Sequence, residues 1–218
     1  MVARLNGGIQ VAQLKEGTSR AEGHLRIWDR FKGDAVSMRV LELDGHATLR
    51  NDHCDEVLYV LERDTGIHLP AGAELPLEGT LTLIGVGSGG RPRPPAPGAG
   101  AATLVRLRDR PIQHTGDRWY RELIQSEITQ FVGSIPPGRA PDHFHLYEEV
   151  LCILQGSGTV WSGDSSAPIG PGSCVYLPAR QAHCVENTGH GELRLLGVFY
   201  PAGSPSMRYP AATSPSQQ

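Results

Sequence analysis

Hydrophobic positions along the chain fall in short runs of strand length, and turn-forming residues separate these runs. The clearest runs cover residues 57–61, 158–161, 174–177 and 193–200, and each is bounded by Gly, Pro, Asn or Asp. This pattern is typical of β-strands that are joined by tight turns. Many short strands at this spacing predict an all-β sandwich or barrel, of which the jelly roll is one form.

Helical periodicity is weak along the whole chain. The best match to a helical period lies near residues 6–16, and we predict one short helix there. The longest apolar runs have the length of a strand, which predicts that no transmembrane helix is present.

A Pro/Gly/Ala-rich segment divides the chain. Residues 87–102 read GSGGRPRPPAPGAGAA, a composition that sustains neither a strand ladder nor a core. The C-terminal end is rich in Pro, Ser, Ala and Gln, as frayed ends often are. The sequence therefore predicts a domain over 1–90, a linker over 91–102, a second domain over 103–205 and a flexible tail over 206–218.

The two predicted domains contain a weak internal repeat. RNDHCDEVLYVLE at 50–62 aligns with HFHLYEEVLCILQ at 143–155, and DTGIHLPAGAEL at 64–75 aligns with GSCVYLPARQAH at 172–183. Between these blocks the second copy has residues 156–171, whereas the first copy has only Arg63. The first copy lacks about one hairpin, so we expect a reduced barrel there.

Three histidines and a glutamate in the second copy form a candidate metal site. His143 and His145 are two residues apart, so on a strand both side chains lie on the same face. Glu149 has the same parity, but a straight strand would place it roughly 13 Å beyond His145. We therefore expect the chain to turn around residues 146–148 and to return Glu149 to the histidines. His183 follows a second strand-and-turn pattern and is the fourth candidate.

These two segments resemble the two motifs of the cupin superfamily. The first motif reads Gly138, four residues, His143-Phe144-His145, three residues, Glu149, six residues and Gly156; the second reads Gly172, five residues, Pro178, two residues, Gln181-Ala182-His183 and Asn187. The first motif is one residue short after its opening glycine, and Arg180 stands where a glycine is usual. The resemblance covers residues 103–203. It implies an all-β fold of two tandem double-stranded β-helix (jelly-roll) barrels, as in a bicupin, with a degenerate N-terminal barrel.

The resemblance also implies a ligand set. The residues at the ligand positions of the motifs are His143, His145, Glu149 and His183. Three imidazoles and one carboxylate suit a divalent transition metal, with iron preferred and Mn, Ni, Cu or Zn as alternatives. Four protein ligands on an octahedral ion leave two positions for water, dioxygen or substrate, which is a catalytic arrangement.

The N-terminal copy departs from this pattern. Arg50 and Asp52 stand at the positions of the first two histidines, Glu56 matches the glutamate, and Leu75 stands at the position of the last histidine. One ligand of four is retained, so we predict no metal in the first barrel.

Several residues near the motifs are candidates for contact with a substrate. They are Gln130, Arg139, Tyr147, Trp161 and Gln181. Glu148 has the opposite parity to Glu149, and we expect its side chain to point to solvent. We expect the run 117–121 to form an inter-barrel or subunit contact.

Composition and charge restrict the partners. The formal net charge is −3 and no cluster of basic residues stands out, which argues against nucleic acid and anionic membranes. The four cysteines have no CxxC spacing, and no apolar block follows the N-terminus, so we predict a cytoplasmic protein with reduced thiols. We expect a small-molecule substrate, and self-association as a homodimer.

Three functions remain open at this point. The first, which we prefer, is a dioxygenase-type oxidoreductase in which one open metal position takes the substrate and the other takes dioxygen. The second is a redox-neutral isomerase, lyase or cyclase, in which the metal acts as a Lewis acid. The third is a non-catalytic cupin that binds a small molecule. The complete ligand set favours an enzyme, and the apolar strands favour a small, partly apolar substrate.

Overall fold

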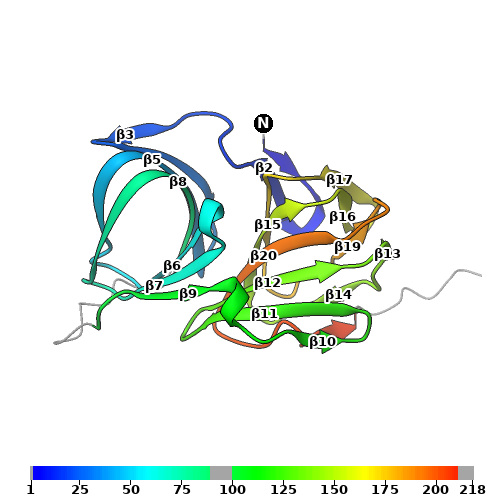
Figure 1. Cartoon of the computed structure of the whole chain (residues 1–218). Coiled ribbons are helices and arrows are strands. Elements are labelled where there is room, and N and C mark those ends of the chain that lie inside the picture. The colour runs from blue at the N-terminus through cyan, green and yellow to red at the C-terminus, as the bar shows by residue number, and fades with distance from the viewer. Residues whose placement is uncertain (1, 89–99, 211–218) are drawn as a thin grey trace, which may run out of the picture.

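The computed structural model describes residues 2–88 and 100–210. Within these ranges the chain forms twenty-one β-strands and three 3-10 helices, η1 (Asn6–Gly8), η2 (Leu61–Arg63) and η3 (Leu107–Asp109). Two β-structures lie side by side, the N-terminal one mostly blue to cyan and the C-terminal one mostly green to red (Figure 1). The predicted all-β fold is confirmed. No helix in the described ranges is long and apolar enough to cross a membrane.

The N-terminal structure is one antiparallel sheet of seven strands. Its spatial order is β3 (Arg20–Glu22), β4 (Leu25–Lys32), β5 (Val36–Arg50), β8 (Glu74–Ser88), β6 (Glu56–Val60), β7 (Thr65–Leu69) and β9 (Thr103–Arg106). Leucines of neighbouring strands, among them Leu41, Leu58 and Leu83, are fully buried in a core of their own.

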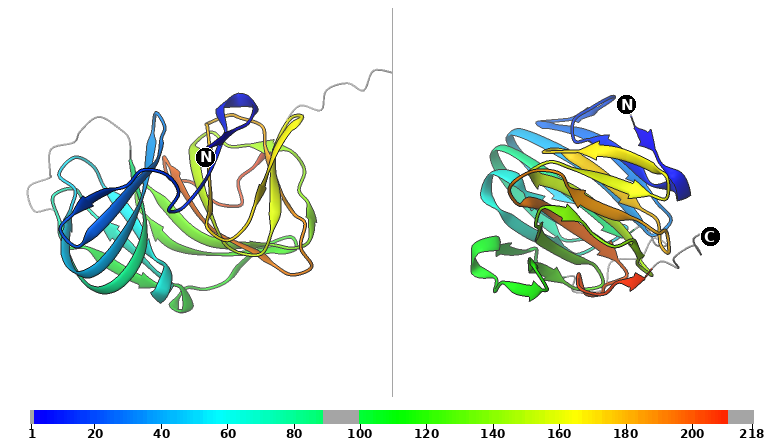
Figure 2. Two further views of the ribbon diagram at one scale, coloured as in Figure 1. Left: turned by 90° about the horizontal axis from the view of Figure 1, so that it is seen from above. Right: turned by 90° about the vertical axis from the view of Figure 1, so that its right-hand side faces the viewer.

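Two long strands let this sheet curl around its core. β5 and β8 have 15 residues each and pair without interruption from Val36 to Arg50. Midway, Gly45 lies opposite Gly79, with φ of 115° and 109°. Side chains rarely adopt such a backbone conformation, so a glycine at both positions allows the paired strands to bend together. The curl is clear from above in Figure 2, and this single curled sheet is compatible with the predicted reduced barrel.

The C-terminal structure consists of two main sheets packed face to face. The larger has the order β1 (Ala3–Arg4), β2 (Gln10–Gln13), β18 (Ser173–Leu177), β15 (Glu148–Gln155), β20 (Leu193–Tyr200), β12 (Thr129–Ile135), β11 (Arg118–Gln125) and β10 (Gln113–Thr115). The smaller has the order β13 (Gly138–Arg139), β19 (Cys184–Asn187), β16 (Gly158–Ser162) and β17 (Ser165–Ile169). Leu151 and Val175 of the larger sheet share a core with Val160 and Val185 of the smaller sheet, as in a jelly roll.

The ends of the two halves cross the predicted domain boundaries. The helix predicted near residues 6–16 is wrong, because β2 pairs with β18 of the C-terminal sheet. Ile9 and Val11 pack into the C-terminal core, and this burial on the edge of β18 outweighs the weak helical pattern. Conversely, β9 pairs with β7 of the N-terminal sheet. The predicted domains 1–90 and 103–205 therefore each contribute strands to the other half, and 91–99 of the predicted linker lie outside the described residues.

The two halves share an apolar core. Val40 and Tyr59 from the N-terminal sheet belong to one buried cluster with Cys152 and Leu196 from the C-terminal sheet. These C-terminal residues lie on the face of the sheet opposite its cavity, so the N-terminal half covers the back of the barrel.

Glu148 joins the two halves by hydrogen bonds. Its carboxylate accepts from the backbone N–H groups of Asp34, Ala35 and Val36, at 3.1, 2.9 and 3.0 Å. The prediction that Glu148 points to solvent is wrong, because its side chain is buried. Its parity is as predicted, but the N-terminal half occupies the space where solvent was expected.

We expect Glu148→Gln to destabilise the protein. The amide keeps one acceptor oxygen but turns an NH2 group toward backbone donors, so at least one buried N–H loses its partner at a cost of about 1–3 kcal/mol. Urea denaturation measures this change in the free energy of unfolding. Glu78→Gln is the control, because Glu78 is exposed and its replacement should change stability by less than about 0.5 kcal/mol. Equal effects of the two variants would contradict the prediction.

Candidate metal centre

Two strand ends bring the three motif histidines together. β14 (His143–Phe144) is a short strand, and His143 forms an antiparallel bridge with His183, with N···O distances of 3.0 and 2.9 Å. His145 follows directly. The chain then bends at Leu146 and Tyr147 and enters β15 at Glu148. This is the turn that the spacing of the motif predicts.

The three motif histidines lie close enough to share one ion, and Glu149 lies beside one of them. The three imidazoles each offer a nitrogen, and these nitrogens lie within 4.8 Å of one another. The fourth residue adjoins them, since Oε2 of Glu149 lies 3.4 Å from Nε2 of His145. His143 lies on β14, Glu149 lies on β15 of the larger sheet, and His183 directly precedes β19 of the smaller sheet. The closed fold, rather than one local segment, therefore holds these residues in place.

Backbone carbonyls fix the ring orientation of all three histidines. Nδ1 of His143 lies 3.1 Å from the oxygen of Pro141, Nδ1 of His145 lies 3.0 Å from that of Met207, and Nδ1 of His183 lies 2.8 Å from that of Gln181. A carbonyl oxygen only accepts, so each Nδ1 carries the proton and each Nε2 keeps its lone pair. This is the arrangement that metal-binding histidines require.

The histidines are held in their neutral form. Burial, together with the charge of His183, lowers the pKa of His143 to about 4. Burial and the same neighbour lower the pKa of His145 to about 3, and burial lowers that of His183. Neutral imidazole is the form that binds a metal. Burial also raises the pKa of Glu149 to about 8, because it outweighs the opposing effect of the positive charge of Arg208. The donor set therefore fits a divalent transition metal.

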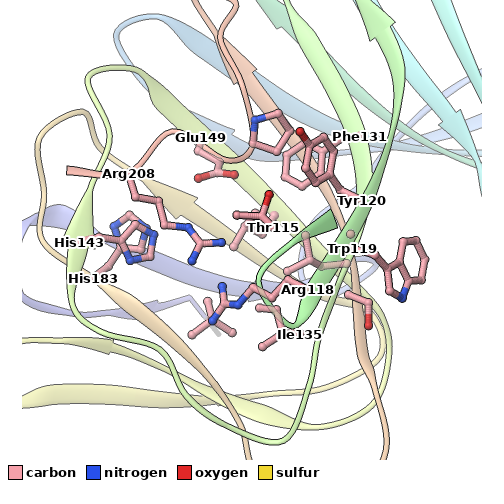
Figure 3. Close-up of a pocket in the computed structure, with 16 residues that line it drawn as sticks. Thr115, Arg118, Trp119, Tyr120, Phe131, Ile135, His143, Glu149, His183 and Arg208 are labelled. Atoms are coloured by element: carbon pink, nitrogen blue, oxygen red, sulfur yellow. The ribbon is translucent and has the colours of Figure 1, made fainter. Parts of the chain in front are cut away.

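A cavity opens beside these groups. Its lining includes His143, Glu149 and His183, and apolar side chains from both sheets, namely Phe131, Ile135, Leu151, Val185 and Leu195. Two arginines, Arg118 and Arg208, also line it (Figure 3). Burial and the nearby charge of Arg208 lower the pKa of Arg118.

The C-terminal segment closes one side of the site. β21 (Tyr209–Pro210) pairs with β14, and the ring of Tyr209 stacks on Phe144 at 5.4 Å. Met207 supplies the carbonyl that orients His145. The predicted flexible tail 206–218 is therefore wrong for residues 206–210, which belong to the site; the remaining residues lie outside the described part of the chain.

The five residues predicted to contact a substrate do not line this cavity in the described structure. Gln130 lies on the opposite face of β12 and donates to the carbonyl of Leu58 in the N-terminal half. The guanidinium of Arg139 lies 4.4 Å from the ring centre of Trp161, whose indole donates to Glu186.

Tyr147 and Gln181 lie behind the ligands. Tyr147 stacks between His145 and Phe199, with ring centres at 4.8 and 4.1 Å, so it supports a ligand from behind. Gln181 donates to Ser162 instead of facing the cavity. Its predicted parity required a regular strand, but Arg180 has a φ of 63° and turns the chain. Arg180 thus adopts the left-handed conformation of the glycine that is usual there.

The corresponding positions in the N-terminal half form ion pairs. Glu56 is buried and accepts two hydrogen bonds from Arg39, at 2.7 and 2.6 Å. Arg50 contacts Asp52 at 2.6 Å and Glu74 at 3.2 Å. The one retained ligand position is therefore neutralised by an arginine.

Comparison with known proteins agrees with this geometry. Residues 131–199 match the family model described as the cupin domain. The chain contains a cupin domain. This domain holds both strand pairs that carry the four candidate ligands.

Relatives and solved structures extend the likeness. Auxin-binding protein 1 of Arabidopsis thaliana is 34% identical over 83 residues, which are 34% of this chain and 42% of the relative. Auxin-binding protein T92 of Nicotiana tabacum is 35% identical over 85 residues, which are 46% of its length. The chain thus matches less than half the length of these relatives.

Two solved structures have the same fold along most of the chain. A glyoxylate-induced protein from Pseudomonas aeruginosa has a TM-score of 0.73 at 13% identity, over 94% of this chain and 93% of its own. Oxalate decarboxylase of Bacillus subtilis has a TM-score of 0.65 at 14% identity, over 88% of this chain and 77% of its own. These likenesses extend beyond the cupin domain into the N-terminal half, and at such identities they show the fold alone.

Proposed function

We propose that this chain is a metal-dependent cupin enzyme that acts on a small organic molecule, with dioxygen as co-substrate. The observation that carries the proposal is the cluster of three neutral, oriented imidazoles with Glu149 beside it, at a cavity lined by His143, His183 and Glu149. A bound divalent transition metal, for which we expect iron, would supply Lewis acidity and one-electron redox chemistry there. Manganese, nickel, copper and zinc are the alternatives for the same donor set.

The chain's own residues would prepare this chemistry. The three carbonyls at Nδ1 keep each Nε2 turned toward a common centre, and Glu149 adds the one anionic ligand. The apolar side chains of the cavity would exclude water and hold an apolar substrate body next to that centre.

Metal content and oxygen uptake test the proposal. We expect the purified protein to contain about one equivalent of a transition metal. We also expect oxygen uptake when iron-loaded protein meets its substrate in a screen of small organic molecules. Iron with uptake supports the oxygen-using enzyme. If the protein contains zinc and converts a substrate without oxygen uptake, the oxygen-using function is wrong. The enzyme is then a redox-neutral isomerase, lyase or cyclase in which the metal is a Lewis acid.

The likeness to the auxin-binding proteins favours a second candidate. Their names describe binding, and they match this chain at 34–35% identity. A non-catalytic cupin would hold its metal and a small molecule but would leave every bound molecule chemically unchanged. Mass spectrometry of the bound molecule after incubation separates this candidate from both enzymes.

A further inference from the structure

Two arginines converge on the cavity from segments that are far apart in the sequence. Arg118 is at the start of β11, and Arg208 directly precedes β21. Both are half-buried, and Figure 3 draws both guanidinium groups within the cavity, beside His143 and His183. Sequence reasoning missed both, because neither belongs to a motif and Arg208 lies in the predicted tail.

Neither guanidinium has a partner in the described structure. The side chains of Arg118 and Arg208 form no hydrogen bond or ion pair with another described residue. The charge of Arg208 acts unfavourably on Arg118, and Asp117, the carboxylate that acts on Arg118, is exposed. The cavity wall itself contains one carboxylate, that of Glu149, which belongs to the candidate metal ligands. The charge of Arg208 also acts favourably on Glu149, but one carboxylate does not balance two guanidinium groups. Two half-buried positive charges that share this single carboxylate, without a hydrogen bond or ion pair, form a site for a further anion.

The other side chains of the cavity wall indicate the chemical class of this anion. Phe131, Ile135 and Leu151 face the same cavity, so one side of the ligand meets apolar surface while another meets two guanidinium groups. The planar fork of arginine matches a carboxylate with two parallel hydrogen bonds. A small acid with an apolar body satisfies both sides of the cavity.

We infer that Arg118 and Arg208 bind the carboxylate of a small, apolar carboxylic acid beside the candidate metal centre. This inference rests on the proposed function for the location of the chemistry, and it names the substrate class. Arg118 and Arg208 determine specificity by charge, and the aliphatic and aromatic wall determines it by shape. The C-terminal segment therefore takes part in recognition through Arg208, in addition to orienting His145 through Met207.

Calorimetric titration of the full chain tests the inference, with the protein in metal-depleted and in zinc-loaded form. The probes are benzoate and butyrate, their neutral amides benzamide and butyramide, and phenylphosphonate. We expect at least one acid to bind, and its amide to bind at least about tenfold more weakly. Arg118→Gln and Arg208→Gln should each weaken binding of the acid by at least about tenfold, and Arg118→Lys should weaken it less because the charge remains.

Arg139→Gln is the matched control. Arg139 belongs to the same cupin half but contacts Trp161 outside the cavity, so its loss should leave acid binding unchanged. Circular dichroism and metal content should be the same in all four arginine variants.

The outcomes separate this inference from the proposed function. Equal binding of acid and amide, no binding of either acid, unchanged binding in both cavity variants, or tighter binding of phenylphosphonate would each overturn the inference. A protein that binds metal but no acid overturns the inference and leaves the metal centre standing. A protein that binds acid through both arginines but no metal overturns the proposed function instead.

Discussion

His183→Ala is expected to lower the affinity for a divalent transition metal by at least about 100-fold while the protein stays folded. Loss of a residue that only hydrogen-bonds to a ligand typically lowers metal affinity by about 10–100-fold. Loss of a ligand itself removes a direct bond to the metal. His183 also links the two motif strands, but its bridge to His143 uses backbone atoms, which alanine retains. We expect His145→Ala to act in the same way.

Competition with a chromophoric chelator measures the affinity, and circular dichroism reports the fold. His190→Ala is the matched control, because His190 is exposed in the same half of the chain and is not part of the histidine cluster. Its metal affinity should equal that of the wild type. Retained affinity in His183→Ala, or the same loss in the control, would contradict the assignment of the ligands. Collapse of the fold in both ligand variants would indicate a structural ion.

The candidate ligands are predictable from the sequence because they lie in two short motifs with characteristic spacing. The two-residue spacing of His143 and His145 sets a shared face, and the length of chain before Glu149 requires a turn, which the structure places at Leu146 and Tyr147. The pairing of this segment with the strand end at His183 follows from the second motif. Short apolar runs bounded by turn residues likewise predicted the all-β fold.

What the sequence leaves open depends on packing between distant segments. The parity of Glu148 is readable, but the presence of the N-terminal half on that face is not. Residues 206–210 have the composition of a frayed end. In the folded barrel, however, Tyr209 stacks on Phe144, and its strand pairs with the edge of β14. Arg208 enters the cavity for the same reason. Strand alternation also fails where a single left-handed residue, Arg180, turns the chain.

Glu149 should make the stability of the metal-free protein depend strongly on pH. Burial raises its pKa to about 8 in the folded chain. In the unfolded chain a glutamate has its ordinary pKa of about 4.3. Between about pH 5 and 8 the folded protein therefore keeps a proton that the unfolded chain has released. The unfolded state binds fewer protons, so the free energy of unfolding falls as pH rises through this window. The loss from this group amounts to about 4 kcal/mol over three pH units.

The histidines act in the opposite direction at lower pH. Their pKa values are lowered by burial, to about 4 for His143 and about 3 for His145. The unfolded chain therefore binds more protons at these groups below about pH 6.5, and their contribution makes stability rise with pH up to that point. Comparison with Glu149→Gln cancels this histidine contribution, because the variant keeps all three imidazoles.

Urea denaturation in the presence of a chelator, repeated from pH 5 to 8, measures the contribution of Glu149. The free energy of unfolding of the wild type should fall, relative to that of Glu149→Gln, by about 4 kcal/mol as pH rises from 5 to 8. With saturating zinc the trend should shrink, because a cation beside the carboxylate favours its charged form. Parallel curves for the two chelated proteins would mean that the carboxylate is not the buried, unneutralised group of this site. A trend that zinc leaves unchanged would mean that Glu149 is buried for a reason other than metal binding.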